Sequence, residues 1–153
     1  MKGYSSQQPE ASIQHNAGWQ HRYNIEQVER ETEDGPVTEW QFDYINTPIA
    51  PNTRDYLKLM RDITIAAPID GVQVGRLEDR ENIKDAIRLW ETLGDPPAIP
   101  WILADNTTRL MSKTELQAIE TQYAVRQMQT FGQYQQLCED LETSDEPESV
   151  VWS

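Results

Sequence analysis

The sequence predicts an α+β protein: a small domain of three helices and short β-hairpins with a long C-terminal helix, preceded by an aromatic β-ribbon and a polar N-terminal arm. A helical pattern without proline runs from Lys113 to about Leu141, and apolar and polar residues alternate between residues 19 and 45. The composition also changes on either side of these segments. The chain therefore divides into a polar arm (1–17), a β-ribbon attachment segment (18–46), an α+β domain (52–141) and an acidic C-terminal tail (142–153).

The arm and the ribbon differ in their apolar content. Residues 1–17 are rich in Ser, Gln, Asn and Pro, so we expect them to be disordered or to become ordered on a partner. One strand is predicted from Trp19, and a second runs from Val37 to Ile45 after the turn signal Asp34-Gly35. An isolated two-stranded ribbon is marginally stable in water, so its apolar face must cover the rest of the chain or a partner protein. Three aromatic residues form that face: Trp40, Phe42 and Tyr44.

The first half of the domain is expected to hold two helices with a small hairpin between them. After a linker that contains prolines (46–52), Asn52 or Thr53 can cap a short helix through about Arg61. A second, amphipathic helix is predicted from Asp79 to Leu93, and Gly94 ends it. The hairpin between the helices would pair the strand-compatible runs Ile63–Ala67 and Val72–Val74 around Pro68–Gly71.

The second half of the domain begins with another hairpin and a capped helix. Short apolar runs flank Asp105-Asn106, whose side chains can bond to their own backbone in a tight turn. Ser112 lies three residues before Glu115, which is the spacing of a capping box. The helix that follows would be roughly 43 Å long at about 1.5 Å per residue.

The apolar residues of this long helix fall into two groups. We expect Leu116, Ile119 and Tyr123 to pack as ordinary core, with Trp101 beside them. The distal group either packs on the aromatic ribbon or associates with another chain as a helical bundle. We therefore name a set of candidate partner-binding residues on the ribbon and the distal helix: Trp40, Phe42, Tyr44, Met128, Phe131, Tyr134 and Leu137.

Composition argues against several classes of protein. The net charge of −13 opposes binding to a phosphate backbone, so we expect no nucleic acid and no anionic membrane as partners. No apolar run is long enough to span a bilayer, and the first twenty residues lack the apolar region of a signal peptide. The acidic tail is expected to be mobile, and its tip Val150-Val151-Trp152 is either incidental or a docking peptide.

Signatures of catalysis and metal binding are also missing from the sequence. There is no phosphate-binding glycine loop and no nucleophile elbow, and the acidic turns lack the ligand spacing of a calcium loop. Cys138 is the only cysteine, so it is expected to be a packed hydrophobe, with an interchain bridge as the alternative. We expect no catalytic residue, no cofactor and no metal.

One stretch carries a resemblance to a known family. Its residues are Pro100-Trp-Ile-Leu-Ala-Asp-Asn-Thr, Leu110 and the Ser/Thr-x-x-Glu-Leu helix start at 112–116. This stretch resembles a domain of formally unknown function that occurs in tailed-phage proteins, mostly tail-fibre and tail-fibre assembly proteins. The likeness extends upstream through Gly71-Val-Gln-Val and Asp79-Arg-Glu-Asn-Ile, so it covers roughly Asn52 to Leu141. The ribbon from Trp19 to Val28 is also similar to segments that precede this domain.

The resemblance implies a structural or assembly role and supplies no catalytic residue. We therefore expect a non-enzymatic accessory or adaptor subunit of a phage tail fibre or baseplate, located in the virion tail after assembly in the host cytoplasm. It would act by protein–protein binding, with a possible homo-oligomer through the long helix. One alternative is a tail-fibre assembly chaperone that leaves the virion. Another is an acidic inhibitor of a basic nucleic-acid-binding protein, since the net charge is −13.

Overall fold

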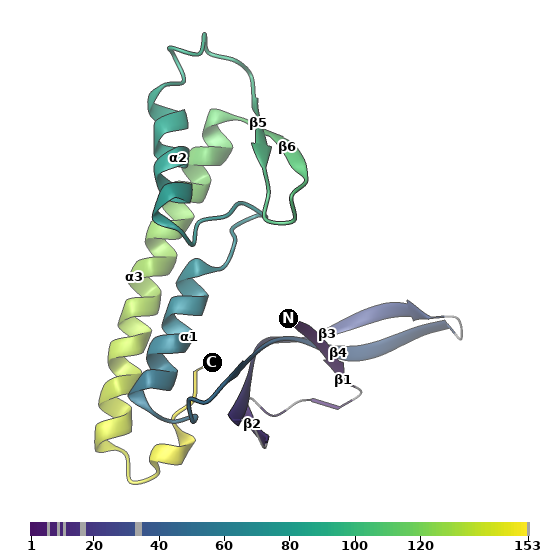
Figure 1. Ribbon diagram of the computed structural model, residues 1–153, viewed down its shortest axis with the longest axis vertical. Helices are drawn as coiled ribbons and strands as arrows, with labels where there is room; N and C mark the ends of the chain where they lie inside the picture. Colours follow the sequence, from purple (N-terminus) through teal and green to yellow (C-terminus); the bar gives the residue numbers. More distant parts are fainter. Residues whose placement is uncertain (6, 9, 11, 16–17, 33–34, 153) are drawn as a thin grey trace. The chain divides into compact units, whose positions relative to one another are not determined.

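The protein is α+β, and its computed structural model describes residues 1–5, 7–8, 10, 12–15, 18–32 and 35–152. Two compact units share the chain. The first consists of Met1–Lys58 with Leu137–Ser153, and the second of Leu59–Gln136. Figure 1 labels the helices and strands of both units.

An antiparallel sheet forms the N-terminal part of the first unit, with strands in the order β1-β4-β3-β2 (Figure 1). Its two central strands confirm the predicted ribbon, since they pair from Trp19–Thr47 to Thr32–Gly35 with an irregularity between Tyr23 and Glu26. Asp34 of the predicted turn lies outside the described residues. The strands are β1 (Lys2–Ser5), β2 (Ser12–His15), β3 (Gly18–Thr32) and β4 (Gly35–Thr47).

The two outer strands correct the expectation of an unstructured arm. β1 pairs with β4, and β2 pairs with β3, so two segments of the polar arm are strands. Each edge of the central ribbon offers a row of backbone N–H and C=O groups that need partners. Pairing through the backbone does not require apolar side chains, which explains why a polar sequence adopts these strands.

Helix α1 (Arg54–Ala66) begins as predicted but ends later. Thr53 Oγ1 accepts a hydrogen bond from the Tyr56 N–H at 3.1 Å, so the predicted cap is confirmed. The helix continues through the run for which a strand was predicted, and that prediction is wrong. The predicted hairpin reduces to a single bridge between Ile69 and Val72. Strand preference of β-branched residues is weak, and here burial of the adjacent Met60 favours the helix.

Helix α2 (Leu77–Arg88) differs from its predicted bounds at both ends. It starts two residues before Asp79, whose carboxylate accepts the Arg76 N–H at 3.0 Å. After the helix, turns continue to Gly94, which has a φ of 84°. Leu93, the last residue of the predicted helix, therefore lies beyond α2 and is exposed.

The predicted hairpin and the start of the long helix are confirmed. β5 (Ile99–Ile102) pairs with β6 (Thr108–Met111), and Asn106 in the turn has a φ of 65°. The Ser112 N–H donates to Glu115 Oε2 at 2.7 Å, while the Glu115 N–H donates to Ser112 Oγ at 3.3 Å. These two bonds form the capping box of α3 (Lys113–Thr143), a helix of 31 residues.

The core of the second unit lies between α2, the hairpin and the N-terminal half of α3 (Figure 1). Trp101 packs against this core, as expected. Each buried residue of this core either lies in a stretch where apolar residues recur at helical or strand spacing or lies next to a turn. The buried residues are Ile69, Val72, Val74, Ile83, Trp90, Met111, Leu116 and Ile119.

The C-terminal tail is structured in the first unit, which corrects the expectation of a mobile segment. A short 3-10 helix, η1 (Pro147–Ser149), leads to Val150, which is buried. Asn52 Nδ2 donates to the Glu148 carbonyl at 2.9 Å, and Arg54 forms an ion pair with Glu142. Of the apolar tip, Val150 thus packs within its own chain, while Val151 is 43% exposed.

Candidate protein-binding surfaces

The aromatic face of β4 is largely covered by the chain itself. Phe42 is only 7% exposed, because Gly3 of β1 pairs opposite it and the Arg22 guanidinium lies 4.9 Å from its ring centroid. Tyr44 donates from its hydroxyl to the Met1 sulfur at 3.4 Å, and Trp40 is half-buried. The structure therefore realises the alternative in which this face packs on the same chain.

The distal residues of α3 are divided between contact with the chain and contact with solvent. Met128 is 70% exposed and Phe131 is 41% exposed. Arg61 of α1 lies over the rings of Phe131 and Tyr134, with its guanidinium carbon 5.2 Å and 4.7 Å from their centroids. Within the second unit, α1 therefore covers part of this distal group. From the sequence, the ribbon or another chain was expected to cover it.

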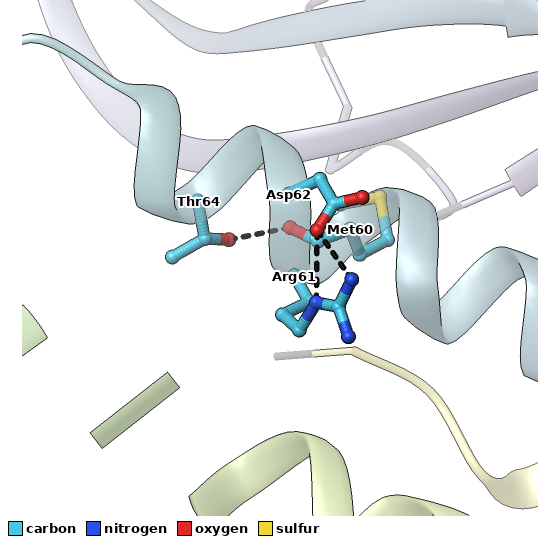
Figure 2. Close-up of polar contacts among 4 residues, drawn as sticks. All are labelled: Met60, Arg61, Asp62 and Thr64. Carbon is cyan, nitrogen blue, oxygen red and sulfur yellow. Dashed lines mark hydrogen bonds and ion pairs between the residues drawn. The ribbon is translucent and has the colours of Figure 1, made fainter. Parts of the chain in front are cut away.

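The charge of Arg61 is already paired on its own helix. Figure 2 shows Arg61 Nε and Nη2 both bonded to Asp62 Oδ1, at 2.8 Å and 2.7 Å. The same view shows the Thr64 hydroxyl donating to the Met60 carbonyl. Because the guanidinium is both paired and stacked, it shields one side of each ring from solvent.

Leu137 belongs to the first unit, where it is half-buried. It lines a hollow together with Ser149, Val150 and Val151 of the tail, and the neighbouring Cys138 is buried as predicted. Of the distal residues predicted to bind a partner, Met128 is thus the most accessible and Leu137 the one that lies against the chain's own tail.

A further apolar surface, which the sequence reasoning missed, lies on the outer face of the hairpin. Ile102 of β5 is 68% exposed and Leu110 of β6 is 66% exposed. Leu110 pairs with Pro100, which is exposed on the same face. The sequence contained a signal for this surface. Alternate residues of a strand point to opposite sides of the sheet, and because Met111 and Trp101 occupy the inner side, Ile102 and Leu110 point outward. We call Pro100, Ile102 and Leu110 the hairpin face.

A groove of about 570 Å³ adjoins the hairpin face. One wall is the strand β5 and the residues after it, and the other is the N-terminal part of α2. The groove contains amide, carboxylate and guanidinium groups beside a tryptophan, so it can bind polar as well as apolar groups. Its lining residues are Gln73, Arg76, Asp79, Asn82, Pro100, Trp101, Ile102, Leu103, Ala104 and Asn106.

The backbone edge of β5 has little capacity to add a strand. The Ala104 N–H donates to the Gly71 carbonyl at 2.7 Å, and Pro100 has no N–H. The Leu103 N–H donates to the Thr107 carbonyl, so by the alternation of an antiparallel ladder only Ile102 directs its N–H away from β6. One donor is too few for strand addition, and a partner of this surface would therefore bind through side chains.

A buried Ser–His pair lies in the first unit. His21 Nε2 lies 2.8 Å from the Ile49 carbonyl, which can only accept, so this nitrogen carries the proton and Nδ1 accepts from the Ser12 hydroxyl at 2.8 Å. Burial lowers the pKa of His21, and the Ile49 hydrogen bond opposes that shift. The residue has no exposed surface, and its ring centroid lies 4.7 Å from that of Tyr56 with the ring planes tilted at 58°, so a substrate in solvent has no access to it.

Two further findings concern the described residues. No group of three His, Cys, Asp or Glu side chains among them is placed to hold a metal ion. Within that same part of the chain, every helix is too short or too polar to cross a membrane.

Comparison with known proteins gives one match. Residues 49–152, more than half of the chain, match the family described as a Domain of unknown function (DUF4376). No curated protein and no solved structure matches the chain. The matched range contains the hairpin, the groove and every helix of the described residues.

Proposed function

We propose that this chain, which belongs to the DUF4376 family, is a non-enzymatic accessory or adaptor subunit of a phage tail fibre or baseplate that acts by protein–protein binding. The resemblance to domains of tail-fibre and tail-fibre assembly proteins supports the phage assignment. The most specific residues of that resemblance, from Trp101 to Asn106, belong to the same hairpin that presents the exposed apolar surface.

The exposure of the hairpin face is the observation on which the proposed binding function rests. Exposed large apolar side chains that lie together on one element mark interaction sites more often than isolated ones do. Here Ile102 and Leu110 stand on a two-stranded sheet whose other side is anchored in the core by Met111. The surface is therefore rigidly supported, and the adjoining groove adds polar groups that can orient a partner.

A tail-fibre or baseplate protein would cover the hairpin face and enter the groove with its side chains. Because β5 has a single outward N–H, the partner contributes a shaped surface rather than an added strand. Among the residues that line the groove, Arg76 and Asp79 supply one charge of each sign, so the groove itself has no excess charge that would repel a partner.

Pull-down experiments with the tagged chain during phage assembly test this function. The wild-type chain is expected to capture a fibre or baseplate protein, identified by mass spectrometry. The variant Ile102→Glu/Leu110→Glu places two carboxylates on the hairpin face and should lose that protein. As a matched control, Leu89→Glu/Leu93→Glu makes the same charge change at two exposed leucines beyond α2 and should still capture that protein. Capture of no tail component by the wild-type chain would refute the proposal.

Mass spectrometry of purified particles distinguishes a subunit that stays in the particle from an assembly chaperone that leaves it. A subunit of the fibre or baseplate is present in the particle, in a fixed ratio to its partner. An assembly chaperone is captured in the infected cell and missing from the particle.

A further inference from the structure

The solvent-facing side of α3 carries no charged residue between Gln117 and Gln136. This contrasts with a chain of net charge −13 and 25% charged residues. It also contrasts with α2, where most exposed residues are charged, namely Glu78, Glu81, Lys84, Asp85 and Arg88. On α3 the charges within this stretch, Glu120 and Arg126, are only partly exposed. The exposed residues are Gln117, Ala118, Thr121, Gln122, Ala124, Val125, Gln127, Met128, Gln129, Phe131, Gly132, Gln135 and Gln136.

Six of these exposed residues lie at alternating spacings of three and four, and we call them the α3 seam: Ala118, Thr121, Val125, Met128, Gly132 and Gln135. That spacing is the repeat by which one helix packs against another. With 3.6 residues per turn, the seam lies on the side of α3 opposite the buried Leu116, Ile119 and Thr130. This side of α3 is therefore left without cover in the second unit.

The side chains of the seam suit close helix packing at its middle. Val125 is 42% exposed and Met128 is 70% exposed. A Cβ added at Gly132 would meet no atom within 4 Å, so a second backbone can approach closely there. Polar members of the seam are uncharged and can hydrogen-bond across a contact.

The absence of charge indicates which partner fits the seam. Two copies of a chain with net charge −13 repel one another over most of their surfaces, because like charges meet. A face without charge avoids that repulsion in a symmetric contact, in which each residue of one copy meets residues of the same set in the other. We infer that the α3 seam is a self-association surface that binds a second copy of this chain.

Residue sizes along the seam favour an antiparallel pair. With Val125 of one copy opposite Met128 of the other, Thr121 meets Gly132 and Ala118 meets Gln135, so each larger side chain meets a smaller one. A parallel pair would place Gly132 opposite Gly132, which leaves a gap. It would also place Met128 opposite Met128, which crowds two large side chains. The antiparallel arrangement also aligns the two helix dipoles favourably.

Sedimentation velocity of the full chain over a wide range of concentration tests the inference. The mass of the wild-type protein should rise from 17.7 kDa toward twice that value as concentration increases. Val125→Glu/Met128→Glu should remain monomeric with an unchanged circular dichroism spectrum, since both side chains are exposed. Ile102→Glu/Leu110→Glu should associate as the wild type does. A monomer at every concentration, or equal association of the Val125→Glu/Met128→Glu variant, would overturn the inference.

Cysteine cross-linking under an added oxidant tests the orientation. Thr121→Cys/Gly132→Cys should form an intermolecular disulfide in high yield, whereas Thr121→Cys alone should not. Efficient cross-linking of Thr121→Cys alone would show a parallel pair and overturn the antiparallel arrangement. The fibre-binding proposal concerns a different face, so the oligomer can fail while the pull-down succeeds, and the reverse.

Discussion

Two glycine-to-alanine substitutions should change stability in opposite directions, although neither added methyl group meets a neighbour. A Cβ at Gly132 or at Gly94 would have no heavy atom within 4 Å, so packing contributes nothing at either position. Gly132 lies in the interior of α3, where glycine is about 1 kcal/mol less favourable than alanine. Gly94 has a φ of 84°, a conformation that costs an L-residue roughly 1–2 kcal/mol.

We therefore expect Gly132→Ala to raise the free energy of unfolding by about 1 kcal/mol, which corresponds to roughly 2–4 °C in Tm for a chain of this size. Gly94→Ala should lower it by about 1 kcal/mol or more. Urea unfolding followed by circular dichroism at high dilution measures both values in the monomer. Destabilisation by Gly132→Ala under these conditions would show that its surroundings are occupied and would refute the reasoning.

Three further predictions concern the cap of α3, the buried histidine and the edge strand. Ser112→Ala removes the acceptor of the Glu115 N–H and should cost about 1 kcal/mol in urea unfolding, whereas Ser112→Asp should retain most of the stability. Because burial lowers the pKa of His21, the unfolded chain takes up a proton at higher pH than the folded one. Stability is therefore complete above the unfolded pKa and falls as pH drops toward the lowered value, and NMR titration of the ring together with unfolding at several pH values checks this. Gly3→Val would bring a Cβ within 2.5 Å of Phe42 Cε2, so β1 should separate from β4 and the amides of Lys2–Ser5 should exchange faster with solvent.

The parts of the fold that the sequence predicts well are those decided by neighbouring residues. The hairpin turn depends on Asp105 and Asn106, and the start of α3 on Ser112 and Glu115. The parts it predicts badly depend on distant partners. β1 and β2 form because the edges of β3 and β4 are available to pair with them. Ile63 was predicted to be in a strand, but it is helical because α1 continues past Arg61.

The candidate surfaces show the same division. Phe42 was assigned to a partner because the strand that covers it comes from residues with no apolar pattern. Ile102 and Leu110 were noted only as members of short apolar runs beside the turn, although alternation in a strand places them on the outer side. Met128 was named as a candidate partner-binding residue, which stays a prediction. It is 70% exposed because a helix that covers a small core on one side leaves the other side to solvent.

The division of the chain between the two units sets the order in which they can fold during synthesis. The second unit is one continuous stretch, so it can fold as soon as Gln136 has emerged from the ribosome. The first unit combines two stretches: Asn52 is bonded to the Glu148 carbonyl and Arg54 is paired with Glu142. Its N-terminal sheet is made before the second unit, whereas the buried Val150 is made after it. Closing this long loop therefore has to wait until the whole second unit has been synthesised, so the first unit is completed after the second can fold.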